Sequence, residues 1–390
     1  MVEIRFYQDI DKPLWDSYVL NHSEATLYHL CGWKNVIEKT YGHKTYYLMA
    51  TKNDEHEKSY DTPQDEIYRT PGISCELKGE YVLGILPLAY LKSIFFGKNL
   101  ISMPFFDIGG VLADSQEIEK ELLSEAIKLA ARLKISKLEL RQIGLLSSLG
   151  SYDFKELTKD SQFITHHWVY QRRSHKVRML LKLPSSSEIL IKSFKSKLRS
   201  QINKTLKEGL YSKIGGIELL EDFYKVFSIN MRDLGSPVHS KKLIRTVLEE
   251  FHQESKIVVI YKETQPLACS LIVGFKDVLE NPWASALKEY SRLSPNMLLY
   301  WTMLEYACNG GYAYFDFGRS SEDEGTYKFK EQWGAEPRRL YWHYFLMNGH
   351  PMGEDDSEKS RFNKAIQYWK KLPVFVTKMI GPPIRRHIGL

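Results

Sequence analysis

One short run of the chain, FDFGRSSEDEGTYKFKEQWG at residues 315–334, combines side chains that could act on a substrate. Lys330 lies between aromatic residues, directly after Phe329 and near Trp333, where its ammonium group could meet developing negative charge. Asp316 stands at the expected end of a strand and could orient a substrate. The run therefore predicts a site that stabilises an anion formed during a reaction.

The same run also permits a structural interpretation. Arg319 could contact a phosphate or carboxylate through two parallel hydrogen bonds, which would support a binding role. Phe329 and Trp333 could instead be core side chains, with the stem of Lys330 along apolar surface and its charge in water. Asp316 could cap a turn. Both interpretations are open on the residues alone.

Acyl transfer to an amine is the chemistry that this residue set favours. The sequence contains no G-x-S-x-G, H-E-x-x-H or GxxxxGK[ST] motif and no G-x-G-x-x-G between a strand and a helix, which argues against most common hydrolases, metalloproteases and nucleotide-hydrolysing enzymes. An activated ester or thioester already carries a good leaving group. The enzyme then needs to place the amine, remove its proton and stabilise the oxyanion.

Composition places the chain among globular proteins. Its 390 residues are 43% hydrophobic and 13% aromatic, which is enough to build the cores of two domains. The net charge of +6 is far from that of a dedicated nucleic-acid binder, so we expect no DNA partner. The mildly basic balance suits a cleft for phosphate-bearing ligands.

The cysteines and histidines indicate neither a metal site nor a disulfide framework. No CxxC pair occurs, and we expect reduced, mostly buried thiols at Cys31, Cys75, Cys269 and Cys308. The pairs His166/His167 and His22/His29 have no partner ligands at suitable spacing, so we expect no bound metal.

The two ends of the chain bear on localisation. The charged N-terminus has no apolar signal-peptide core and no window approaches 18 apolar residues, so we expect a cytoplasmic protein. The C-terminal segment FVTKMIGPPIRRHIGL mixes apolar residues with Lys378, Arg385, Arg386 and His387, and it could lie on the anionic surface of the inner membrane. A tail packed on the protein body is the alternative.

The two halves of the chain repeat one order of elements, which is two strands, a helix and a strand. The first half has these elements at 46–51, 81–93, 117–135 and 136–142, and the second half has them within 256–275, at 297–310 and at 312–319. A duplicated unit explains the repeat, so we predict a mixed α/β fold of two similar domains with a cleft between or beside them. The predicted parts are an N-terminal domain at 1–165, a crossover at 166–186, a C-terminal domain at 187–345 and a tail at 346–390.

Residues 187–210 predict one basic amphipathic helix. Apolar residues form a stripe, and Lys and Arg residues, including Lys195 and Arg199, occupy much of the remaining surface. The basic surface is either a solvated face or a contact for phosphates, because clustered cations can hold a diphosphate or follow an RNA backbone.

Several of these segments together resemble the Fem-type aminoacyltransferases that build peptidoglycan bridges. KSKLRSQINKTLKEGL looks like the basic helix of that family, FKEQWG like its Phe-Lys followed by an aromatic-Gly, and WKNVIEKTYGHKTYYLMA like the start of its first domain. With ISMPFFDIGG, the chain is especially similar to FemAB-related proteins found beside exosortase and exopolysaccharide gene clusters in Gram-negative bacteria. The resemblance covers about residues 5–345 and implies two tandem GNAT-like acyltransferase domains.

The resemblance also implies roles for individual residues. Arg199, with Lys195 nearby, would contact the diphosphate of a cell-envelope precursor, and Lys330 would assist the oxyanion. We assign catalysis to Lys330 and Asp316, and substrate binding to Lys34, Asp107, Lys195, Arg199, Tyr300, Arg319, Phe329 and Trp333.

The first domain would contribute a phosphate-binding lysine and an aspartate. Lys34 and Lys39 both fit the position of the lysine. Asp107 and Asp114, in DIGGVLAD, are the candidates for the aspartate, each displaced from the family's position.

The predicted function is transfer of an acyl or aminoacyl group to an amine of a peptidoglycan or exopolysaccharide precursor. The family takes its amino acid from aminoacyl-tRNA, although this chain lacks the long helical arm that some members use near tRNA. An acyl-CoA-dependent GNAT acting on an amino sugar is the alternative, although SRLSPN and SEDEGT are poor copies of a Gly-rich pyrophosphate loop. A non-catalytic envelope-assembly module is a further alternative. The donor would be a co-substrate, and we expect no tightly bound cofactor.

Overall fold

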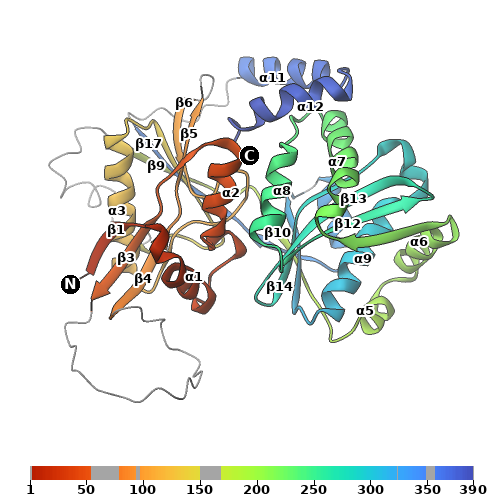
Figure 1. The fold of residues 1–390 in the computed structure, drawn as a ribbon, viewed down its shortest axis with the longest axis horizontal. Helices are drawn as coiled ribbons and strands as arrows, with labels where there is room; N and C mark the ends of the chain where they lie inside the picture. Colours follow the sequence, from red (N-terminus) through yellow and green to blue (C-terminus); the bar gives the residue numbers. More distant parts are fainter. Residues whose placement is uncertain are drawn as a thin grey trace. The chain divides into compact units, whose positions relative to one another are not determined.

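The computed structural model describes residues 2–53, 79–93, 97–149, 168–322, 324–347 and 356–389 (Figure 1). Cys75 and the His166/His167 pair lie outside these residues. Of the predicted thiols, Cys31, Cys269 and Cys308 are free and buried, as expected. None of the described helices combines the length and the apolar character needed to span a bilayer.

The elements of the described residues have the following bounds. The strands are β1 (Val2–Phe6), β2 (Lys44–Thr45), β3 (Leu48–Asn53), β4 (Glu80–Leu86), β5 (Ala89–Ser93), β6 (Gly97–Ile101), β7 (Leu112–Ala113), β8 (Lys137–Gln142), β9 (Trp168–Arg173), β10 (Val177–Lys182), β11 (Leu210–Gly215), β12 (Ser255–Lys262), β13 (Gln265–Phe275), β14 (Val278–Ala286), β15 (Tyr314–Ser320), β16 (Glu336–Arg339) and β17 (Tyr341–Met347). The α-helices are α1 (Lys12–Asn21), α2 (Gly32–Tyr41), α3 (Gln116–Arg132), α5 (Ser187–Ser193), α6 (Ser196–Lys207), α7 (Leu220–Leu234), α8 (Lys241–Glu250), α9 (Pro295–Asn309), α10 (Gly325–Glu331), α11 (Asp356–Trp369) and α12 (Val374–Arg385).

The chain divides into two compact units, each made of separate segments. Unit 1 comprises Met1–Lys34, His43–Arg173 and Tyr341–His350, and unit 2 comprises Asn35–Gly42, Ser174–Leu340 and Pro351–Leu390. These bounds differ from the predicted ones. Strand β17, which the sequence placed in the C-terminal domain, pairs with β8 and β9 inside unit 1.

Unit 1 contains two sheets in its described part, with strand orders β1-β3-β4-β7 and β2-β5-β6-β8-β17-β9. Helix α3 confirms the predicted periodic helix. Ser115 caps its first turn by accepting a hydrogen bond from the Ile118 amide, and Leu122, Leu123 and Ala126 lie in the core. The apolar spacing read from the sequence therefore places α3 on the sheets as expected.

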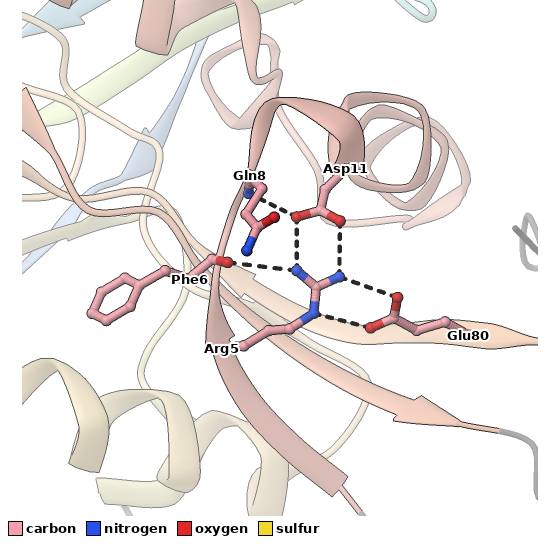
Figure 2. A network of polar contacts seen from close by, with 5 residues as sticks. All are labelled: Arg5, Phe6, Gln8, Asp11 and Glu80. Atoms are coloured by element: carbon pink, nitrogen blue, oxygen red, sulfur yellow. Dashed lines mark hydrogen bonds and ion pairs between the residues drawn. The ribbon is translucent and has the colours of Figure 1, made fainter. Parts of the chain in front are cut away.

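A guanidinium group joins three separate parts of unit 1 (Figure 2). The Nη atoms of Arg5, in β1, donate to both carboxylate oxygens of Asp11 at 2.7 and 2.9 Å, and Arg5 Nε and Nη2 donate to Glu80 at 3.0 and 3.1 Å. Asp11 also accepts from the Gln8 amide at 2.7 Å. Although burial opposes ionisation, the bonds from Arg5 hold the pKa of Asp11 below its usual value. The planar fork thereby fixes the start of α1 against β1 and β4.

Unit 2 is built on a seven-stranded sheet with the order β11-β12-β13-β14-β15-β10-β16. All of its neighbouring strands are antiparallel except β14 and β15, which are parallel and are connected through α9. Cys269 of β13 contacts the α7 backbone, whereas Ala268 shares an apolar cluster with α9. Because successive strand residues face opposite sides, α7 and α9 cover opposite faces of the sheet (Figure 1).

The predicted single helix at 187–210 is wrong, because the structure has two helices there. Helix α5 ends at Ser193, the backbone of Phe194 is extended (φ −71°, ψ 147°), and α6 begins after Lys195. The Phe194 ring is buried against Trp301 and Trp333. The helix therefore breaks at Phe194, whose ring packs in the core, although the apolar spacing in the sequence continues through this position.

The buried His343 of β17 predicts acid sensitivity in unit 1. Its Nδ1 lies 2.8 Å from the Tyr170 hydroxyl, and burial lowers the pKa of His343 from 6.5 to about 4. A lowered pKa means that the unfolded chain binds the proton first, so the contribution to stability is complete above pH 6.5 and is lost as the pH falls toward 4. We expect a loss on the order of 2 kcal/mol in unfolding free energy between pH 7 and pH 5, measured by urea denaturation.

A histidine replacement tests the source of this loss. His343→Gln should show a smaller drop between the two pH values than the wild type, whereas His252→Gln, at an exposed position of unit 2, should not change it. An unchanged drop in His343→Gln would refute the assignment.

Candidate functional site

The sheet of unit 2 opens between its two parallel strands. The pairing of β14 with β15 covers only Val278–Glu280 with Tyr314–Asp316, although β14 continues to Ala286 and β15 to Ser320. Beyond this point, β14 pairs with β13 and β15 pairs with β10. The two strands thus stop pairing with each other after Glu280 and Asp316.

A β-bulge marks the same place on β14. Leu271 of β13 pairs with Trp283, and Val273 pairs with Glu280, so Asn281 and Pro282 stand opposite one residue of β13. Pro282 has no amide hydrogen to donate, and a bulge is a position in a sheet where this is tolerated. The bulge turns β14 at the residue where its pairing with β15 ends.

A buried ion cluster lies at this end of the pairing. Glu280 and Asp316 are partners in the register, and only 3% and 4% of their surfaces are exposed. Arg178 of β10 donates through Nε to Asp316 Oδ2 at 2.5 Å, and its Nη2 lies 3.4 Å from Glu280 Oε1. One cation therefore compensates two carboxylates that would otherwise repel each other across neighbouring strands.

The structure changes the predicted setting of Asp316. It is buried inside β15 rather than exposed at a strand end, and its Oδ1 accepts a hydrogen bond from the Gly318 amide at 2.8 Å. Gly318 has φ +73°, a conformation that glycine adopts without strain. Asp316 thus shapes the strand after the opening, and its predicted catalytic role stays a prediction.

Lys330 lies on the short helix α10 and is buried, with 7% of its surface exposed. Its ammonium group donates to the carbonyl oxygens of Gly318 at 3.1 Å and Arg319 at 2.7 Å. These carbonyls belong to the part of β15 that no longer pairs with β14. A fixed positive charge is thereby placed beside the opening of the sheet, held by backbone rather than surrounded by water.

Three predicted binding residues form one aromatic cluster. Tyr300 of α9 stacks on Phe317 with ring centroids 5.4 Å apart and meets Phe329 edge-on at 5.0 Å, and Phe329 lies 6.3 Å from Trp333. Burial raises the pKa of the Tyr300 phenol, although a hydrogen bond with Asn281 opposes this effect. The burial of Trp333 supports the structural interpretation of its ring, whereas Phe329 is half-buried.

A largely apolar cavity of about 710 Å³ lies beside this cluster. Its walls include Leu183, Leu190, Phe194 and Trp333, and the exposed Lys195 stands at its lining. Arg199, one turn further along α6, is partly exposed, and its Nη1 lies 3.5 Å from the Lys192 carbonyl oxygen. Lys195 and Arg199 are therefore accessible to a ligand, and their binding role stays a prediction.

The remaining predicted residues belong to unit 1. Lys34 Nζ lies 3.6 Å from the Asp9 carboxylate and 5.9 Å from the Tyr7 ring centroid. The Asp107 carbonyl oxygen accepts a hydrogen bond from the Trp342 indole at 3.2 Å. The other eight predicted residues lie in unit 2, where the structure brings six of them together around β15, α9 and α10.

The alternatives for these two positions have partners of their own. Lys39 Nζ lies 3.9 Å from Glu250, and Asp114 accepts a hydrogen bond from the Tyr18 hydroxyl at 2.9 Å. No cluster of three or more potential metal ligands occurs among the described residues.

Sequence reasoning missed Arg178 and Glu280, although both lie in the cluster at the opening. A signal was present for Arg178, since it is the one charged residue in the apolar run VRMLL of β10. A charge within a buried strand indicates a buried partner, but the partner depends on which strands are neighbours.

Residues 192–331 match the family model described as acetyltransferase (GNAT) domain. The matched segment is about a third of the chain, and it contains Arg199, Asp316 and Lys330. No curated protein has a sequence that matches this chain.

Among solved structures, the chain is similar to FemX with a TM-score of 0.61 and 14% identity, covering 90% of this chain and 98% of that one. It is also similar to a conserved protein of unknown function from Bacteroides thetaiotaomicron, with a TM-score of 0.51 and 9% identity over 89% of this chain and 100% of that one. Such low identities show a shared fold only. The predicted mixed α/β fold is confirmed, and the match at residues 192–331 supports a GNAT-like domain in unit 2. The match to the acetyltransferase domain supports an acyltransferase.

Loss of the shared cation should destabilise unit 2 strongly. Arg178→Met would remove the cation that contacts both buried carboxylates, so we expect a loss of about 3–5 kcal/mol in unfolding free energy by urea denaturation. Arg338→Met is the matched control, because Arg338 stands opposite Arg178 on β16 but makes an exposed ion pair with Glu336. The control should lose less than about 1 kcal/mol. Equal losses in the two variants would contradict the role of the cluster.

Proposed function

We propose that the protein forms an amide by transferring an acyl or aminoacyl group to an amine of a peptidoglycan or exopolysaccharide precursor. The observation that carries this proposal is the buried ammonium group of Lys330 beside the opening between β14 and β15. It lies inside the segment that matches acetyltransferase (GNAT) domains. The resemblance to FemAB-related proteins of exopolysaccharide clusters supports an envelope precursor as the acceptor.

The chemistry fits a site that supplies charge and position. The acceptor nitrogen attacks the carbonyl carbon of an ester or thioester, a C–N bond forms, and the C–O or C–S bond breaks. The amine loses a proton, and the leaving oxygen or sulfur takes one up. The charge of Lys330 would stabilise the oxyanion of the tetrahedral intermediate in a carbonyl oriented toward the opening. Because Gly318 and Arg319 already hold the ammonium group, little reorganisation would be needed at the moment of reaction.

The acceptor would be held through its diphosphate by Lys195 and Arg199. Lys195 precedes the first residue of α6 and Arg199 lies in its first turn, so both stand at the start of this helix. Both are accessible, and an ammonium together with a guanidinium group suits adjacent phosphates.

An acyl-CoA donor is the second candidate, because the matching family model is that of an acetyltransferase domain. In that case the acceptor would be an amino sugar or a polysaccharide unit. In the first candidate, the donor would be aminoacyl-tRNA. Both donors are consumed in the reaction, so neither reaction calls for a resident cofactor.

Transfer assays distinguish the donors and test Lys330. Label would be followed from radiolabelled aminoacyl-tRNAs, or from acetyl-CoA, into envelope-precursor extract. Lys330→Met should lower kcat by roughly 10²- to 10³-fold, the size expected for one oxyanion contact. Lys328→Met is the control, since Lys328 is exposed on the same helix, and it should keep wild-type rates.

Each result of this assay has a defined meaning. Ribonuclease-sensitive transfer that Lys330→Met loses supports the aminoacyl donor, and transfer from acetyl-CoA alone supports the second candidate. No transfer from either donor by a folded wild-type protein would favour a binding module over an enzyme. Thermal melting of each variant separates lost chemistry from lost folding.

Removal of the α6 cations should affect acceptor binding more than chemistry. Lys195→Ala/Arg199→Ala should raise KM for a diphosphate-bearing acceptor roughly 10-fold or more, because charge-assisted hydrogen bonds are lost, with a small change in kcat. Lys207→Ala, at the exposed far end of α6, is the control. An acceptor fragment without the diphosphate should show the same KM with all three proteins. A KM increase for that fragment would contradict phosphate binding.

A further inference from the structure

The C-terminal hairpin exposes an unusual amount of apolar surface. Tyr368 of α11 and Phe375 and Met379 of α12 are 72%, 72% and 70% exposed. Among the large hydrophobic residues of the described chain, Ile10 alone is more exposed, at 77%, and it lies in unit 1. We refer to Tyr368, Phe375 and Met379 as the C-terminal apolar patch.

The opposite face of α12 is packed on unit 2. Thr377 and Gly381 are buried, and a Cβ added to Gly381 would lie 3.1 Å from the Val238 backbone nitrogen. Arg385 Nε donates to His239 Nε2 at 3.0 Å, and the Lys378 ammonium lies 5.5 Å from the Tyr224 ring centroid. Helix α12 is thus a fixed element beside α7 (Figure 1), not a loose tail.

The patch lies on the outward side of this fixed helix. Phe375 and Met379 are four residues apart and so share a face, which lies about half a turn from the face of Thr377 and Gly381. The turn before α12 is also tied down, since Arg232 Nη1 donates to the Leu372 carbonyl oxygen at 3.1 Å. A rigid support therefore presents two large apolar side chains to the surroundings.

The segment that carries the patch, residues 363–389, has charges of one sign, and Glu221 of α7 lies near Lys378. Residues 363–389 contain no Asp or Glu, whereas their six Lys and Arg residues are Lys364, Lys370, Lys371, Lys378, Arg385 and Arg386. Lys364, Lys370, Lys371 and Lys378 are exposed. An anionic partner would be attracted to this part of the molecule, and an apolar layer within that partner would cover the patch.

We propose that α12 and the end of α11 dock unit 2 onto an anionic phospholipid surface. Phe375 and Met379 would enter the boundary between head groups and acyl chains, Tyr368 would lie at head-group level, and the lysines would contact lipid phosphates. A bilayer supplies the negative charge and the apolar layer in one partner. A tail packed on the body and a tail on a membrane are the alternatives that the sequence leaves open. In this proposal both hold, because the inner face of α12 packs on the body and its outer face contacts the membrane.

Vesicle co-sedimentation of the full chain tests the proposal, independently of any transfer activity. The probes are vesicles of phosphatidylcholine alone and vesicles with phosphatidylglycerol added. The wild type should pellet with the anionic vesicles, and Phe375→Ser/Met379→Ser should weaken partitioning at least 10-fold. Lys370→Gln/Lys371→Gln should reduce the preference for anionic vesicles and its dependence on salt. Ile10→Ser, which removes an equally exposed apolar side chain of unit 1, should bind like the wild type.

Several results would overturn the proposal. One is a wild type that pellets with neither kind of vesicle. Another is binding that survives Phe375→Ser/Met379→Ser and is displaced by RNA, which would indicate a nucleic-acid surface. A third is a wild-type dimer in light scattering that this double variant converts to a monomer, with no lipid binding, because the patch would then face a second copy. All substituted side chains are exposed, so unchanged melting temperatures are expected and keep these results interpretable.

Discussion

The compensation of two buried carboxylates by Arg178 is the interaction on which the candidate site depends. Glu280 and Asp316 face each other across parallel strands, and burial would make two uncompensated charges there very costly. The cation comes from β10, the strand on the other side of β15. Such a cluster adds little net stability compared with apolar packing. Its contacts join β10, β14 and β15 at the residues where the pairing of β14 with β15 ends.

The rest of the site adjoins these contacts. The bulge at Asn281 and Pro282 turns β14 directly after Glu280. On β15, Asp316 accepts a hydrogen bond from the Gly318 amide. The ammonium group of Lys330 donates to the carbonyl oxygens of Gly318 and Arg319. The position of Lys330 therefore depends on β15, and the position of β15 depends on Arg178. A change at Arg178 in β10 would reach the proposed oxyanion site through three contacts, which are Arg178 to Asp316, Asp316 to Gly318 and Gly318 to Lys330.

The sequence predicted those elements whose pattern involves only residues near each other in the chain. The periodicity of α3 and the strands β12 and β13 involve neighbouring residues, so their patterns were legible. Strand β14 was missed because Pro282 interrupts its pattern, and a proline there makes sense only beside the bulge. The break at Phe194 and the pairing of β17 with β8 and β9 depend on contacts far along the chain. Lys330 was proposed from its aromatic neighbours, and a resemblance gave Arg199 its predicted role, whereas Arg178 could not be assigned a partner without the topology.

The catalytic and the structural interpretations of Lys330 are compatible. A charge that must stabilise a short-lived oxyanion is most effective when it is already fixed and partly shielded from water. The two backbone carbonyls and the burial that fix Lys330 are the same features that a structural role would require. Only experiments with substrate can separate the two roles. If Lys330 is structural, its replacement lowers the stability of the protein. If it is catalytic, its replacement lowers kcat even in a variant that is as stable as the wild type. For that reason, the comparison that distinguishes them is kcat measured on variants whose melting temperature is known.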